Sequence, residues 1–115
     1  MQFEPAVILI NTEEIKKTKT CLQTLVLNSF INFKVFLVEN GNYSRWQNYF
    51  DLLKINGEVI INKSNTGVAS SRNLGIKKAL KENFEWIWIL DNDTLIDKNC
   101  LEKLSLTWLI LPGTV

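Results

Sequence analysis

The sequence contains no histidine, and its 115 residues include only two cysteines, Cys21 and Cys100. Without histidine the chain has neither a Ser-His-Asp triad nor an imidazole ligand for a metal. The cysteines lie far apart and form no C-x-x-C pair, so we expect free buried thiols in a reducing cytosol. Any chemistry must therefore use carboxylates, amides, hydroxyls or arginine.

Strong charge of either sign and long apolar runs are also missing. The 13 basic and 12 acidic residues give a net charge of +1 and are scattered along the chain, unlike those of a nucleic-acid-binding surface. The apolar run near the N-terminus stops after Ile10, and the run over residues 104–111 is far shorter than the ~20 residues of a membrane-spanning helix. We therefore expect no nucleic-acid partner, no signal peptide and no transmembrane segment.

Four short apolar runs are continuous rather than alternating, which is typical of strands covered on both faces. Between them, apolar residues recur at the three-to-four-residue spacing of amphipathic helices. This alternation predicts an α/β, Rossmann-like fold, with a mostly parallel β-sheet flanked by helices and joined by right-handed crossovers. The four predicted strands are residues 6–10, 35–38, 59–61 and 86–90.

Short polar side chains predict where the helices begin, because they accept from the unpaired N–H groups of a first turn. Thr12 and Ser44 are the expected caps of the first two helices, and the third is expected to open soon after Gly67. We expect Asp97 to cap a fourth helix over residues 98–108, which Pro112 and Gly113 would end.

Ligands of such folds bind outside the carboxyl ends of the strands, and the residues that follow these strands are polar. Asp91, Asn92 and Asp93 follow the last strand, and two carboxylates there suit Mg²⁺ or Mn²⁺. A D-x-D sequence on its own is more often an ordinary turn.

The second strand runs into residues 39–42, which also have a turn composition, with Gly41 or Asn42 able to take positive φ. Alternatively, Glu39 accepts from a base N–H or a ribose hydroxyl. Residues 65–75 form a glycine-containing loop that leads into a helix whose N-terminus favours an anion. Arg72 there pairs with phosphate or, as is more common, with a nearby acid.

Four motifs taken together resemble glycosyltransferase family 2. They are V-x-x-x-N, L-V-E-N-G-N, N-x-G-V-A-x-x-R-N-x-G-I and W-I-x-x-L-D-N-D-T-x-I-D, in this order within residues 6–103. The stretch N-T-G-V-A-S-S-R-N-L-G-I is the most diagnostic. The resemblance implies a GT-A fold and inverting transfer from a nucleoside-diphosphate sugar, with a UDP- or dTDP-sugar favoured.

The resemblance also assigns roles to residues. It places Glu39 where the family has an Asp that contacts the base, Asp91 near the ribose and metal, and Asp93 at the position of the metal ligand, with Mg²⁺ or Mn²⁺ as the implied cofactor. The family's first strand commonly ends in P-T-Y-N, which residues 10–13, I-N-T-E, replace here. The remaining expected donor-binding residues are Asn11, Asn65, Gly67, Arg72 and Asn73.

In domain terms, we expect residues 1–103 to be the nucleotide-sugar-binding half of a GT-A domain and residues 104–115 an atypical tail without resemblance to the family. The acceptor half, with its general-base carboxylate, would then be missing, as in a gene fragment, a frameshift product or a truncated chain. We therefore expect donor binding without transfer.

The alternative is a catalytically inactive remnant or interaction module with the same fold. A phospho-receiver is less favoured, because Asn11 and Thr12 replace its paired acids.

The same resemblance sets expectations about partners and place. The family acts on a carbohydrate or lipid-linked acceptor in polysaccharide biosynthesis, and we expect a cytoplasmic protein, either free or peripheral to the inner face of the membrane. An unpaired sheet edge and an apolar tail predict self-association.

Overall fold

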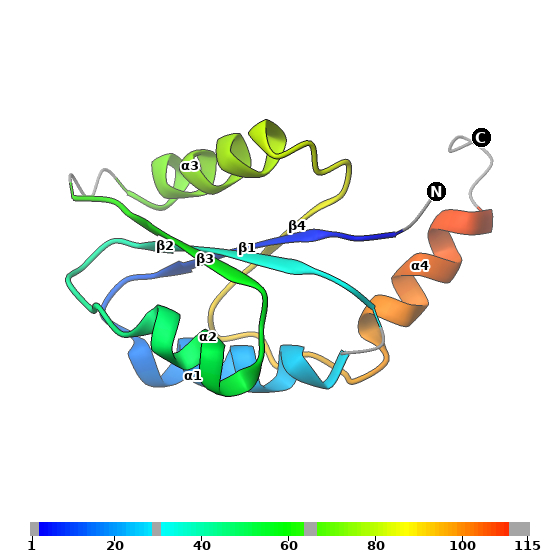
Figure 1. Ribbon diagram of the computed structural model, residues 1–115, viewed down its shortest axis with the longest axis horizontal. Coiled ribbons are helices and arrows are strands. Elements are labelled where there is room, and N and C mark those ends of the chain that lie inside the picture. The colour runs from blue at the N-terminus through cyan, green and yellow to red at the C-terminus, as the bar shows by residue number, and fades with distance from the viewer. Residues whose placement is uncertain (1–2, 29–30, 64–66, 111–115) are drawn as a thin grey trace.

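The computed structural model describes residues 3–28, 31–63 and 67–110, with side chains described as far as residue 106. The predicted alternation of strands and helices is confirmed, with a short 3-10 helix, η1, added after the first helix (Figure 1). The elements are β1 (Ala6–Asn11), α1 (Ile15–Leu25), η1 (Val26–Asn28), β2 (Lys34–Glu39), α2 (Trp46–Leu53), β3 (Gly57–Ile61), α3 (Val68–Lys81), β4 (Ile87–Leu90) and α4 (Cys100–Ile110).

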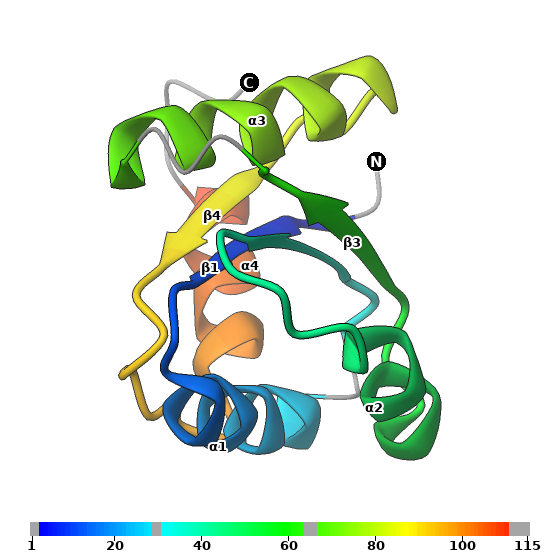
Figure 2. The same ribbon diagram turned by 90° about the vertical axis from the view of Figure 1, so that its left-hand side faces the viewer.

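The four strands form one parallel sheet in the order β3-β2-β1-β4. The chain moves outward from β1 to β3 and then returns across the sheet to β4 on the other side of β1. Because right-handed crossovers in opposite directions lie on opposite faces, α1 and α2 cover one face and α3 the other (Figure 2). The reversal puts the topological switch point between β1 and β4, where such sheets bind ligands.

The core lies on both faces of the two central strands, β1 and β2. Val7 and Leu9 pack on the side of α1 and α2, whereas Ile8 packs on the side of α3. Coverage on both faces therefore explains why the sequences of β1 and β2 are continuous apolar runs. The edge strands are less covered, and Ile61 of β3 and Ile89 of β4 are 51% and 42% exposed.

Gly75 allows α3 to lie close to the sheet. A Cβ at this position would come within 2.7 Å of Ile8 Cγ2 on β1, which is closer than side chains pack. Because α3 also carries Arg72, this contact sets the height of the arginine above the ends of β1 and β4.

Two predicted helix caps are wrong. Helix α1 begins after Glu14 and α2 after Arg45, and neither preceding residue makes a side-chain capping hydrogen bond. The Thr12 hydroxyl instead accepts a hydrogen bond from Asn40 Nδ2 at 3.1 Å, so it joins the ends of two strands. Ser44 lies one residue too early to cap α2. The third helix was predicted to start soon after Gly67, and this is confirmed, since α3 begins at Val68; Gly67 has φ of 101°.

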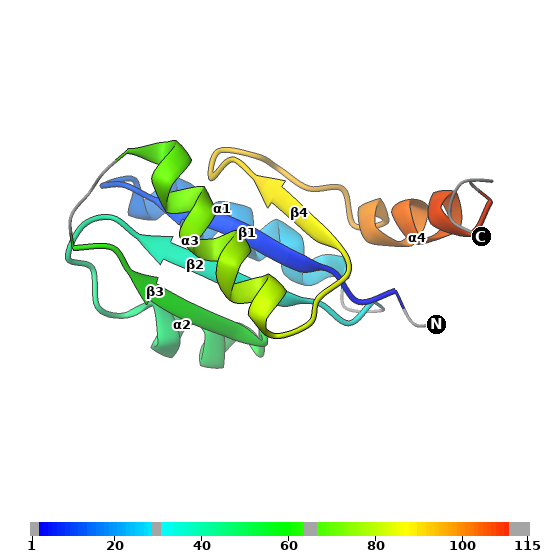
Figure 3. The same cartoon turned by 90° about the horizontal axis from the view of Figure 1, so that it is seen from above.

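The N-terminus of α4 is held by a residue that is distant in sequence. Asn28 accepts from the Leu101 N–H at 3.0 Å and donates to the Asp97 carbonyl at 3.1 Å. Asp97 itself accepts from the Asn99 N–H at 2.8 Å, so it caps the turn before a helix that begins two residues later than predicted. The predicted stop at residues 112–113 lies outside the described residues. Helix α4 extends beyond the sheet at the end opposite to the carboxyl ends of the strands (Figure 3).

Within the described part of the chain, no helix has the length and apolar character needed to cross a membrane.

Candidate functional site

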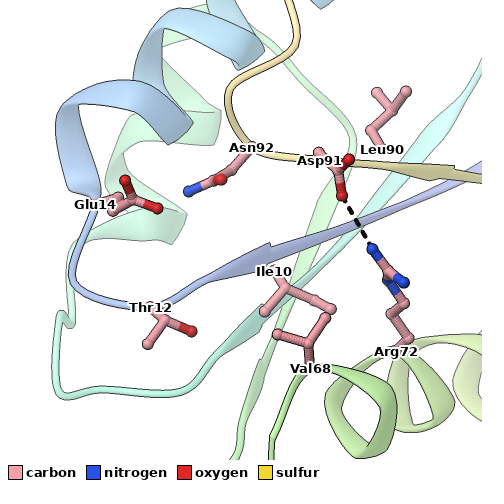
Figure 4. A pocket seen from close by; sticks show the side chains of 8 residues that line it. All are labelled: Ile10, Thr12, Glu14, Val68, Arg72, Leu90, Asp91 and Asn92. Carbon is pink, nitrogen blue, oxygen red and sulfur yellow. Dashed lines mark hydrogen bonds and ion pairs between the residues drawn. The ribbon is translucent and has the colours of Figure 1, made fainter.

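A hollow of about 150 Å³ lies at the switch point between β1 and β4 (Figure 4). The β1 end, the start of α3 and the β4 end each contribute to it. Arg72 Nη2 and Asp91 Oδ1 face each other across the hollow and form an ion pair of 2.9 Å. The expectation that Arg72 pairs with a nearby acid is therefore confirmed. The lining residues are Ile10, Thr12, Glu14, Val68, Arg72, Leu90, Asp91 and Asn92.

Arg72 has further capacity to donate. In the described part of the molecule its Nε is buried and has no hydrogen-bond partner. The ion pair uses only one of the five guanidinium N–H groups, and the two side chains are 39% and 70% exposed, so solvent screens it. A buried donor without a partner is unfavourable, so a hydrogen-bond acceptor that reached this N–H would stabilise the protein.

Asp91, Asn92 and Asp93 do form a turn, in which the Thr94 N–H donates to the Asp91 carbonyl at 3.1 Å. The turn leaves the carboxylates of Asp91 and Asp93 exposed. Among the residues described, no group of three His, Cys, Asp or Glu side chains is placed to hold a metal. A cation at this turn would need oxygen ligands from phosphate and water, as Mg²⁺ commonly takes.

Two titratable side chains, Glu14 and Cys21, lie near the turn. Glu14 pairs with Lys17 at 2.8 Å, and this hydrogen bond and charge lower the Glu14 pKa, which keeps a second carboxylate ionised beside the hollow. Cys21 lies beneath the turn, with its Sγ 4.0 Å from the Asp91 carbonyl oxygen. Burial, with the nearby charge of Asp93, raises the pKa of Cys21 to about 11, so the thiol stays neutral at physiological pH.

A second hollow, of about 250 Å³, lies beside the first, at the ends of β1 and β2. The loop between β1 and α1 separates the two. Residues 10, 12 and 14 line the first hollow, whereas residues 11, 13 and 15 line the second. This loop is therefore a ridge with a hollow on each side. The second hollow is lined by Asn11, Glu13, Ile15, Glu39, Asn40, Gly41, Asn42 and Tyr43.

Glu39 is only 1% exposed and accepts three hydrogen bonds within the protein. The donors are Asn11 Nδ2 at 2.9 Å, Trp46 Nε1 at 2.7 Å and the Gly41 N–H at 2.8 Å. A Cβ on Gly41 would lie 2.9 Å from Glu39 Oε2. The glycine is thus needed for this close approach. Neither Gly41 nor Asn42 takes the positive φ that its residue type allows.

The bonds at Glu39 continue as a chain to the β4 turn. Thr18 on α1 donates to Asn11 Oδ1 at 2.6 Å and accepts from Asn92 Nδ2 at 3.1 Å. Thr18 and Trp46 were not predicted as site residues. A signal for Thr18 existed, because it is a polar residue at helical spacing from Ile15 and Leu22, on the buried face of α1.

A second buried group ties α3 to the strand ends. Asn40 Oδ1 accepts from Ser71 Oγ at 2.6 Å and from Asn62 Nδ2 at 2.9 Å, and all three side chains are buried. Neither Ser71 nor Asn62 was predicted. Ser71 is next to Arg72 in sequence, so its bond to Asn40 fixes the turn of α3 that carries the arginine.

The predicted donor-site residues divide into separate groups. Arg72 and Asp91 meet at the first hollow, while Asn11 and Glu39 form the floor of the second. Gly67 precedes α3, and apart from its chain neighbours no described residue has an atom within 4 Å of where its Cβ would be.

Of the predicted residues that the structure describes, Gly67, Asn73 and Asp93 line neither hollow. Asn73 is exposed on α3, and Asp93 is exposed in the turn after β4. Asn65 lies outside the described residues. No observation tests the binding role of any of these side chains, so their assignments stay predictions.

Comparison with known proteins gives one family. The model of Glycosyl transferase family 2 matches residues 6–108. Among curated proteins no match is found.

Solved structures with a similar fold include S. aureus TarS 1-349, at 20% identity and a TM-score of 0.74, with 90% of this chain and 32% of that chain covered. The same TarS region in complex with UDP gives 21% identity, a TM-score of 0.75 and coverage of 90% and 31%, and its complex with UDP-GlcNAc gives 20%, 0.74 and coverage of 90% and 30%. The chain thus spans about a third of the length of these structures. At this identity the likeness confirms the GT-A fold.

Proposed function

Because the family model covers residues 6–108, the chain belongs to glycosyltransferase family 2, and on that premise we propose that it binds a nucleoside-diphosphate sugar across the two hollows. The observation that carries the proposal is Arg72, a cation with an unused buried Nε, at the topological switch point of the sheet. A UDP- or dTDP-sugar is the favoured donor. The TarS structures with UDP and UDP-GlcNAc support this class of ligand.

The diphosphate belongs in the first hollow. Val68, the first residue of α3, lines this hollow. The N-terminus of a helix presents free N–H groups and partial positive charge to an anion. Gly67 leaves open space next to this N-terminus. Arg72, one turn further along α3, would donate Nε and Nη groups to phosphate oxygens, which a guanidinium can do in a bidentate manner.

The residues of the β4 turn fit a divalent metal. We propose that Asp91 and Asp93 hold Mg²⁺ or Mn²⁺, because their exposed carboxylates lie two residues apart and the donor phosphates would supply further oxygen ligands. When bound, such a metal would stabilise negative charge on a leaving diphosphate.

Transfer of the sugar to the hydroxyl of a carbohydrate or lipid-linked acceptor, with inversion, is the proposed reaction of the whole protein. In it, Arg72 would offset the charge that grows on the diphosphate as the glycosidic bond breaks. We assign no general base among the described residues. The alternative is an inactive remnant or interaction module that keeps the fold without binding a donor.

Calorimetry with UDP and with dTDP, in the presence and absence of Mn²⁺, tests the proposal. We expect Asp93→Ala to remove the Mn²⁺-dependent part of the affinity, and Arg72→Gln to weaken binding by about tenfold with or without the metal. Asp51→Ala is the matched control, because Asp51 is an exposed aspartate on α2 that lines neither hollow. Absence of binding by the unmodified chain under both conditions would support the inactive module.

A cytoplasmic location, in solution or at the inner face of the membrane, and a role in polysaccharide biosynthesis accompany this proposal. The free thiols of Cys21 and Cys100 support a reducing compartment. Cell fractionation that places the chain outside the cytoplasm and the inner membrane face would contradict the location.

A further inference from the structure

The second hollow has polar side chains of two kinds. Those on its floor already have partners within the protein. Glu39 accepts three hydrogen bonds, and Asn11 donates to Glu39 and accepts from Thr18. The Asn40 side chain donates to Thr12 through Nδ2 and accepts from Ser71 through Oδ1. All three floor residues are buried, so their orientation is set by the fold.

The rim of the second hollow is different. Glu13 and Asn42 both line the hollow and both are exposed, so their polar atoms face solvent. Glu13 has φ of 59°, a left-handed conformation that is uncommon for residues other than glycine, asparagine and aspartate. Glu13 lies in the loop between β1 and α1, in which successive residues line the first and the second hollow in turn. Glu13 is on the side of the second hollow.

Apolar groups complete the wall. Ile15 lines the hollow, and so does Tyr43, whose ring packs edge-on against Trp46 with centroids 4.8 Å apart. Lys19 lies 5.6 Å from the same tyrosine ring. The hollow therefore combines a fixed aromatic wall with one carboxylate and one amide at its rim, which suits a flat heterocycle with a polar edge.

We propose that Glu13, together with Asn42, selects the base of the donor, and that Glu39 is a positioning residue that does not contact the base. This inference rests on the proposed donor binding. A nucleoside diphosphate with its phosphates beside Arg72 would cross the 10–15 ridge and place its base in the second hollow. Glu39 lacks an exposed oxygen for this task, whereas Glu13 has one.

The chemistry of a carboxylate predicts the class of base. An ionised carboxylate only accepts hydrogen bonds, and an amide both donates and accepts. Uracil and thymine present an N–H between two carbonyl groups, so the N–H would donate to Glu13 and one carbonyl would accept from Asn42. Cytosine presents an unprotonated ring nitrogen at the same position, which would face Glu13 as acceptor against acceptor. The site therefore favours a uracil or thymine nucleotide over a cytosine nucleotide.

The test compares the affinities of UDP and CDP for the full chain by calorimetry, with the melting temperature measured in parallel. We expect a preference for UDP of about tenfold in the unmodified chain, which Glu13→Gln removes without changing the melting temperature, because the new amide can donate to cytosine. Glu85→Gln is the matched control, since Glu85 is an exposed glutamate that lines neither hollow, and we expect it to leave the preference unchanged.

Glu39→Gln separates positioning from base contact. Its new amide group would meet the donor of Gly41 or of Trp46, so we expect a lower melting temperature with UDP and CDP weakened alike. An unchanged preference in Glu13→Gln overturns the inference, as does a preference lost in Glu39→Gln at an unchanged melting temperature. Binding of neither nucleotide by the unmodified chain refutes the proposed function as well, and so is distinct from both of these results.

Discussion

Replacing Gly75 by alanine sets two opposing effects against each other in α3. Alanine favours a helix over glycine by about 0.5–1 kcal/mol, which would stabilise the protein. The added methyl group would also enter the contact between α3 and β1, and overpacking of this kind costs about 1–3 kcal/mol.

The structure decides which effect prevails. The new Cβ would lie 2.7 Å from Ile8 Cγ2, while ordinary contacts begin at 3.4 Å, so the helix and strand must separate by about 0.7 Å (3.4 − 2.7). The obstructing methyl belongs to a β-branched side chain that is fully buried on a central strand, and its χ1 angle is stiff. We therefore expect Gly75→Ala to lower the free energy of unfolding by about 1–2 kcal/mol.

Urea unfolding followed by tryptophan fluorescence measures this loss, and Ile8→Leu provides the control. Leucine moves the side-chain branch from Cβ to Cγ, so it removes the methyl that alanine would meet. We expect Gly75→Ala to cost at least about 0.5 kcal/mol less in the Ile8→Leu background than alone. Because Arg72 lies one turn before Gly75, Gly75→Ala should also weaken UDP binding. A more stable Gly75→Ala variant, or costs that simply add in the double variant, would refute the close contact.

Further predictions concern the buried hydroxyl, the buried thiol and the sheet edge. Ser71→Ala should lower the free energy of unfolding by about 1 kcal/mol, and no more than that because Asn40 still accepts from Asn62. The control, Lys77→Ala at an exposed position of α3, should change the free energy of unfolding by less than about 0.5 kcal/mol. Equal losses for the two variants in urea unfolding would contradict this prediction. Burial, then the charge of Asp93, raises the Cys21 pKa from 9.0 to about 11, so its contribution to stability is complete below pH 9 and is lost as pH rises towards 11. Cys21→Ala should therefore show a shallower fall in unfolding free energy over that range, and identical slopes would count against the shift. Light scattering at rising concentration should show self-association through the β4 edge that Ile89→Lys reduces, and a monomer throughout would exclude it.

The strands were predictable because each is a continuous apolar run. The bounds of all four strands agree with the predicted ranges to within two residues at either end. The reason is physical, since β1 and β2 are covered on both faces and tolerate only apolar side chains there. The pairing of Arg72 with a nearby acid was also predictable. Asp91 ends the strand beside β1, and the start of α3 faces the same edge of the sheet.

The helix starts were less predictable because local capping rules apply only when no distant residue satisfies the same groups. Asn28 accepts from Leu101 across 73 residues of sequence, and the Thr12 hydroxyl bonds Asn40 rather than the first turn of α1. Such bonds depend on the strand order, which sequence spacing does not contain.

The inward orientation of Glu39 was hidden for a similar reason. Its sequence neighbours suggest an exposed turn, yet its partners include Asn11 on the next strand and Trp46 on α2. A buried carboxylate requires several donors, and here they come together only after β1, β2 and α2 have packed. Residue type therefore identified a polar strand end, whereas its role depended on the tertiary structure.

The hydrogen-bonded chain from Trp46 through Glu39, Asn11 and Thr18 to Asn92 passes beneath both hollows. Their hydrogen bonds to one another hold these side chains in fixed orientations, so a ligand bound in either hollow would not have to immobilise them. Preorganisation of this kind removes part of the entropic cost of association. It also limits adaptation, because a ligand of different shape cannot be accommodated by turning one of these groups without breaking its bond to the next.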